Sequence, residues 1–130
     1  MITGRTIGAI VAGFIVWITL EALLHLAAIL VWPDYAAAAP TRDFNLPMLI
    51  ARLASGAAIT LIAGATVTRI SGYDNRAVRI FATTLLLLAV AHHLQPSVWA
   101  AYPLWYHLVF WSYLAPLTLF GKRLVSRRKD

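Results

Sequence analysis

The sequence predicts an all-α fold, a polytopic transmembrane four-helix bundle, on three observations. Of the 130 residues, 61% are hydrophobic and only 12% are charged, whereas soluble domains average about 45–50% apolar and about 25% charged residues. The apolar residues stand in long continuous runs rather than in the alternation typical of barrel strands. Proline-rich or turn-forming segments divide these runs into four. We therefore expect residues 1–130 to form a single transmembrane domain.

The first predicted helix covers about residues 7–32 and ends where Pro33-Asp34 interrupts the apolar run. Residues 33–47 contain three prolines and two aspartates, which is typical of an exposed loop with a short interfacial turn. The second helix is expected over about 48–70.

A turn sequence at residues 71–76 separates the second helix from a third over about 78–94, which Gln95-Pro96 ends. The fourth helix is expected over about 104–121, because Pro103 favours a helix start. A basic tail at residues 122–130 follows it. Runs of this length match the ~17–25 residues that cross a bilayer.

The basic residues predict the orientation, since Lys and Arg are enriched on the cytoplasmic side of a membrane. Nine of the eleven fall at one end of the predicted bundle: Arg5, Arg69, Arg76, Arg79, Lys122, Arg123, Arg127, Arg128 and Lys129. Both termini should therefore be cytoplasmic, with the 33–47 and 95–103 loops outside. The net charge of +6 then reflects topology and contact with anionic lipid, and we expect no nucleic-acid partner.

Six ionisable residues lie within the predicted spans, where charged groups are costly and usually functional. At ~1.5 Å of helical rise per residue, they fall at similar depths in the outer half of the bilayer. Antiparallel threading should gather them into a polar outer-leaflet pocket that binds a ligand or relays protons, and only one of the two adjacent histidines can face inward. The six are Glu21, His25, Arg52, His92, His93 and His107.

Each of these residues also has a structural explanation that the sequence leaves open. Glu21 could be a hydrogen-bonded neutral acid with His25 as its partner, Arg52 could extend its head group to the lipid headgroups, and the other histidines could be interfacial donors. Trp32, Tyr35, Trp99, Tyr102, Trp105 and Tyr106 all fall at the outer helix ends, as an aromatic belt would.

A stripe of small and polar residues follows Arg52 at every fourth position of the second helix. Small residues allow helices to approach closely in lipid, so we expect this stripe to be a helix-packing surface. It consists of Gly56, Thr60, Gly64 and Thr68.

Cysteine is absent, which excludes disulfides, thiolate metal sites, iron–sulfur clusters and a cysteine nucleophile. No triad-like set stands in the loops, so an enzyme is not expected. We expect an accessory subunit or binding component of a larger membrane complex or homo-oligomer, without a cofactor. An alternative is a haem b or divalent-metal protein with His25, His92 and His107 as ligands.

Another alternative is a proton- or ion-coupled transporter that uses Glu21 and His25. A glutamate in the first of four helices is similar to the small multidrug transporters, but their dual-topology members need balanced loop charges and the charge bias here predicts one orientation. The layout as a whole resembles short four-helix inner-membrane proteins of bacteria: a Glu-x-x-x-His first helix, a proline-rich outer loop, a glycine-rich second helix and a Pro-Leu-Trp start to the fourth. This resemblance implies a multi-pass protein of the bacterial cytoplasmic membrane and no particular activity.

Overall fold

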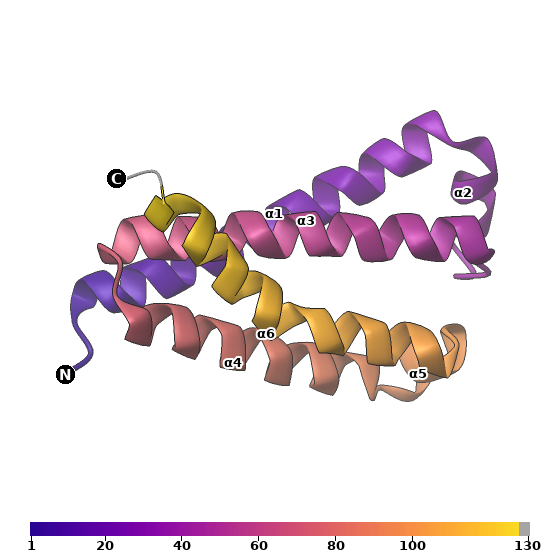
Figure 1. The fold of residues 1–130 in the computed structure, drawn as a ribbon. Coiled ribbons are helices and arrows are strands. Elements are labelled where there is room, and N and C mark those ends of the chain that lie inside the picture. The colour runs from indigo at the N-terminus through magenta and orange to yellow at the C-terminus, as the bar shows by residue number, and fades with distance from the viewer. Residues whose placement is uncertain (128–130) are drawn as a thin grey trace.

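The computed structural model describes residues 1–127, which form six helices and no strand (Figure 1). The all-helical prediction is therefore confirmed for this part of the chain. The four long helices are α1 (Gly4–Val31), α3 (Leu46–Ser71), α4 (Asn75–His93) and α6 (Leu104–Ser126). Two short helices, α2 (Pro33–Ala38) and α5 (Pro96–Ala101), lie in the segments expected to be loops.

The two short helices and the end of α6 differ from the sequence prediction. Pro33 and Pro96 each stand in the first turn of a six-residue helix, a position where the missing amide hydrogen costs nothing. α6 continues to Ser126 instead of ending near residue 121, because the basic residues that follow Gly121 are good helix formers. Arg128 and Lys129, the end of the predicted basic tail, lie outside the described residues.

The N-terminus, the end of α6 and the turn between α3 and α4 lie at one end of the molecule, while α2 and α5 lie at the other (Figure 1). We call these the terminal end and the α2–α5 end. Hydrogen bonds hold α1 to the turn at the terminal end. Arg5 Nε donates to the Ile70 carbonyl at 2.7 Å, and Thr6 Oγ1 donates to Asp74 Oδ2 at 3.2 Å. The basic residues of the described chain, apart from Arg42 and Arg52, gather at this end.

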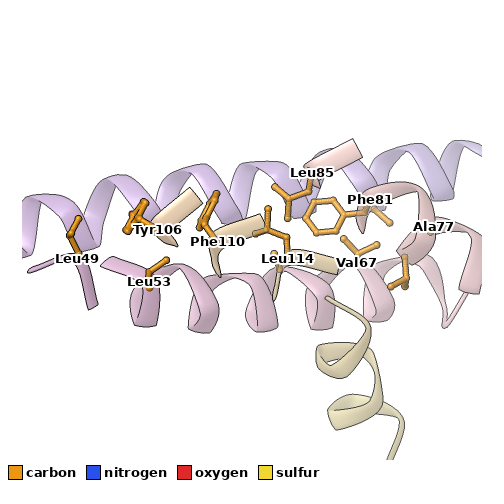
Figure 2. Packing of buried hydrophobic residues seen from close by; sticks show 12 residues of the cluster. Leu49, Leu53, Val67, Ala77, Phe81, Leu85, Tyr106, Phe110 and Leu114 are labelled. Atoms are coloured by element: carbon orange, nitrogen blue, oxygen red, sulfur yellow. The ribbon is translucent and has the colours of Figure 1, made fainter. Parts of the chain in front are cut away.

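The apolar core runs along the molecule between α3, α4 and α6 (Figure 2). Leu49 and Tyr106 mark its α2–α5 end, and Val67 and Phe81 lie near the terminal end (Figure 2). Helix α1 adds one fully buried residue, Ala9, to this core, and the partly buried Ile10, Phe14, Val16 and Trp17 pack against it. Most of the 28 residues of α1 therefore lie on the surface of the molecule.

The predicted packing stripe lies where α6 crosses α3 (Figure 1). Gly64 of α3 faces the backbone of Thr118, and Gly121 of α6 faces the backbone of α3 at Leu61 and Ala65. A methyl group at Gly64 would lie only 2.9 Å from Thr118 Cα. Glycine is thus required on both helices for this close approach.

The other members of the stripe are also buried on α3. Thr60 and Thr68 are fully buried, and their hydroxyls donate to the carbonyls of Gly56 and Gly64 at 2.7 and 2.8 Å. Thr60 Oγ1 also accepts a hydrogen bond of 3.2 Å from Trp17 Nε1 of α1. The stripe therefore contacts α6 on one side and α1 on the other.

Two helices among residues 1–127, α1 and α3, are long and apolar enough to cross a membrane by length and composition. In α4, arginines at one end and histidines at the other flank a shorter apolar segment. In α6, Trp, Tyr, His and Pro side chains lower the hydropathy. The count of four crossings therefore stays a prediction.

Candidate functional site

Arg52 is the centre of a hydrogen-bonded group at the α2–α5 end. Its Nη1 donates to Tyr35 Oη at 2.6 Å and lies 3.3 Å from His25 Nδ1, and Tyr35 Oη lies 2.9 Å from the same Nδ1. A neutral imidazole offers one acceptor nitrogen. Tyr35 can therefore accept from Arg52 and donate to His25, which places the His25 proton on Nε2. The group joins α1, α2 and α3.

Aromatic rings cover the Arg52 guanidinium. Its Cζ lies 5.1 Å from the ring centre of Phe44 and 5.9 Å from that of Tyr102. Phe44 in turn stacks on Tyr35, with ring centres 4.9 Å apart. Cation–π contacts of this kind contribute about 0.5–2 kcal/mol. Burial raises the pKa of the Tyr102 phenol although the charge of Arg52 opposes the shift, so this ring stays neutral beside the cation.

Glu21 pairs with Arg52 only loosely. Its Oε1 lies 3.8 Å from Arg52 Nη2, beyond hydrogen-bond distance, and 35% of the Glu21 side chain and 20% of the Arg52 side chain are exposed. Pairs with this degree of exposure stabilise a fold by about 0–1 kcal/mol. Arg52 Nε is buried and has no hydrogen-bond partner within residues 1–127. The guanidinium thus keeps donor capacity that the protein itself does not fill.

His93 and His107 form a second, separate pair. Their Nδ1 atoms are 2.8 Å apart, and His107 Nε2 lies 3.3 Å from the carbonyl oxygen of Trp99. A carbonyl can only accept, so His107 carries its proton on Nε2 and its Nδ1 accepts from His93 Nδ1–H. His93 Nε2 is then left as an acceptor. Both rings are buried, and His93 stacks on Phe110 with ring centres 4.8 Å apart.

Arg52 lines two adjacent cavities large enough for a small molecule, besides a third of only about 50 Å³. The first, which we call the inner chamber, has a volume of about 410 Å³ and lies between α1, α3, α4 and α6. Its walls are mostly apolar and aromatic, and Glu21, Arg52, His92 and His93 supply its polar groups. The second, the outer chamber, has a volume of about 550 Å³ and lies toward the segment between α2 and α3. Its lining includes Arg42, Arg52, His25 and Tyr102.

The structure places five of the six predicted site residues in two groups. Glu21 and His25 both lie beside Arg52, while His93 and His107 lie within hydrogen-bond distance of each other. Of the adjacent histidines, His93 is buried and His92 is exposed at the rim of both chambers.

The three histidines considered as metal or haem ligands do not meet. His25 contacts Tyr35 and Arg52, His107 contacts His93 and Trp99, and His92 is exposed. Within the described part of the chain, no cluster of three His, Cys, Asp or Glu side chains could hold a metal ion.

Sequence reasoning missed the tyrosines of the site. Tyr35 and Tyr106, assigned to the aromatic belt, are only 2% and 4% exposed. Trp99 and Trp105 are about 40% exposed, which fits the exposed rings of an aromatic belt better. A buried tyrosine hydroxyl needs a partner, and Arg52, which lies inside the second apolar run, indicated only that a polar partner was required, not that it is Tyr35.

No protein-family model matches the chain, and no match is found among curated proteins or among solved structures.

Proposed function

We propose that the chain is an integral protein of the bacterial cytoplasmic membrane with four spanning helices and cytoplasmic termini. In this proposal it acts without catalysis, as a binding component or accessory subunit. The observation that carries the binding role is the inner chamber, which combines apolar walls with one polar end inside a largely apolar molecule.

The surface of α1 supports the membrane placement. Large apolar side chains stand exposed along the helix, among them Ile15, Ile18, Leu30 and Val31 at 59–80%. Exposing apolar surface to water costs about 25 cal/mol per Å², and lipid removes this cost. At ~1.5 Å per residue, α4 and α6 are about 28 and 34 Å long, close to the ~30 Å hydrocarbon core. Four antiparallel crossings are therefore consistent with the helix lengths.

The chamber supports binding more than catalysis. Its volume lies in the range of about 300–1,000 Å³ typical of small-molecule sites. Its polar groups are held by neighbours, Arg52 by Tyr35 and His93 by His107, and this leaves them suited to hold a ligand in place. A second candidate is proton- or ion-coupled transport, favoured by Glu21, which lines both chambers and is only loosely paired.

Single cysteines test the topology, because the natural chain has none. Thr41→Cys lies in the exposed link between α2 and α3, Ser126→Cys at the end of α6, and Ser112→Cys on the exposed surface of α6 at mid-length. In intact cells, a membrane-impermeant maleimide should label position 41 directly and position 126 only after lysis. Position 112 should react at neither stage.

Two outcomes of this experiment overturn the membrane proposal. Labelling of positions 41 and 126 from the same side would contradict the four crossings. Rapid labelling of position 112 by the polar reagent would place the α6 surface in water.

A further inference from the structure

We infer that the two chambers together bind an anionic amphiphile with one apolar chain, the chain in the inner chamber and the anionic head group in the outer chamber near Arg42 and Arg52. This inference rests on the proposed function, because it takes the membrane placement and the binding role as its premises.

The two chambers are adjacent and differ in polarity. Five residues line both: Trp17, Ile18, Glu21, Arg52 and His92. On the inner side the walls are apolar, with Phe14, Leu85 and Phe110 among them. On the outer side Arg42, His25 and Tyr102 replace these side chains. A ligand that fills both chambers must therefore be apolar at one end and polar at the other.

Residues of α1 and α4 line the inner chamber on two of its sides. These helices meet through the edge-to-face contact of Phe14 with Phe81, whose ring centres are 4.9 Å apart. Toward the α2–α5 end, the chamber separates them. Ile18 of α1 and Leu88 of α4, 61% and 56% exposed, line this part of the chamber and also face outward. In a membrane, an apolar chain could enter between them directly from the lipid.

The charges around the outer chamber favour an anion. Two arginines line it, and Glu21 is the single acidic residue among its described lining residues. Arg42 is exposed and makes no ion pair in the described chain. A cationic head group would meet two like charges against one carboxylate. An anionic head group would instead bring the lining close to neutrality.

Arg52 lines both chambers, so it would lie at the junction between the head group of the ligand and its apolar chain. Tyr35 and the rings of Phe44 and Tyr102 hold its guanidinium in place, while its contact to Glu21 is 3.8 Å long. A carboxylate or phosphate oxygen forms shorter, charge-assisted hydrogen bonds with a guanidinium. The loose pair with Glu21 therefore leaves Arg52 able to bind such an oxygen.

Photolabelling in nanodiscs of zwitterionic phosphatidylcholine tests this inference. The probe is a long-chain carboxylate with a diazirine in its chain, and mass spectrometry maps the labelled peptides. Dodecanoate, dodecyl phosphate, dodecanol and dodecylamine compete for the site. We expect saturable labelling of α1 and α4 around the inner chamber, with both anions competing at least tenfold better than the alcohol or the amine. A preference between the two anions would identify a carboxylate or a phosphate head group, and either supports the inference.

Two sets of variants test separately the arginine charges near the head group and the space of the inner chamber. Arg42→Gln, in the exposed link, should weaken binding of both anions about threefold and leave dodecanol binding unchanged. Arg52→Gln should weaken binding of both anions about tenfold or more. Ala89→Trp, which fills the inner chamber, should abolish saturable labelling. Ala91→Trp on the exposed surface of the same helix is its matched control and should label as the natural protein does.

The outcomes distinguish this inference from the proposed function. If dodecanol competes as well as the anions and Arg42→Gln changes nothing, the anionic class is wrong, while saturable labelling of the chamber still supports a binding component. If no labelling is saturable and Ala89→Trp behaves like Ala91→Trp, the binding pocket itself is refuted, and this inference with it.

Discussion

A methyl group at Gly64 tests the close contact between α3 and α6. In Gly64→Ala, the added Cβ would lie 2.9 Å from Thr118 Cα and nearer still to the Thr118 carbonyl oxygen. Both are backbone atoms, so no side-chain rotation relieves the clash and the two helices must move apart. Overpacking of this kind costs about 1–3 kcal/mol. Alanine recovers about 0.5–1 kcal/mol through its higher helix propensity, which leaves a net loss of about 0–2.5 kcal/mol, centred near 1 kcal/mol.

Gly8→Ala is the matched control, because a methyl group at Gly8 of α1 meets nothing within 4 Å. Its stability should be unchanged or higher by up to about 1 kcal/mol. Both variants can be unfolded by heating in micelles of a nonionic detergent, with helical circular dichroism as the signal. Gly64→Ala should unfold at a lower temperature than the natural protein. If it unfolds at the same temperature as Gly8→Ala, the backbones of α3 and α6 are not in contact at this position.

Four further substitutions, measured by the same unfolding transition, test the polar groups. Tyr35→Phe removes the acceptor of Arg52 and should cost about 1–3 kcal/mol; an unchanged midpoint would mean that this hydrogen bond contributes nothing. Glu21→Gln should change stability by less than about 1 kcal/mol, because the pair is loose and partly exposed, and a larger loss would show that the carboxylate has a stronger partner. His107→Phe leaves His93 Nδ1–H without an acceptor and should also cost about 1–3 kcal/mol. The double variant with His93→Phe should lose less than the sum of the two single losses, and simple additivity would refute the pairing.

The long helices could be predicted because continuous apolar runs bounded by proline or turn residues leave few alternatives. The short helices α2 and α5 could not, since six residues are too few for a periodic signal and the local propensity of Pro33 and Pro96 fits a turn as well as a first helical turn. The end of α6 was placed too early because the apolar run ends there, although the backbone hydrogen bonds continue to Ser126. Hydropathy marks where a helix leaves an apolar environment, not where its helical geometry ends.

The height of each candidate site residue along the bundle could be predicted, but the direction that it faces around its helix could not. Helical rise is constant, so the sequence was enough to place Glu21, His25 and Arg52 at similar heights. Which side a residue faces depends on packing between helices, and only the structure distinguishes His93 from His92. Tyr35 was missed for another reason. Its position depends on the path of the α2 segment back toward α3, which no pattern in the sequence encodes.

The backbone contact between α3 and α6 restricts which length changes the chain can tolerate. Each residue turns an α-helix by about 100°, so one residue inserted between Gly56 and Gly64 would rotate Gly64 away from Thr118 and bring a larger side chain against it. The same insertion in residues 39–45, between α2 and α3, would leave that crossing untouched. Deletions and duplications should therefore accumulate in that link and be rare in the middle of α3 and α6.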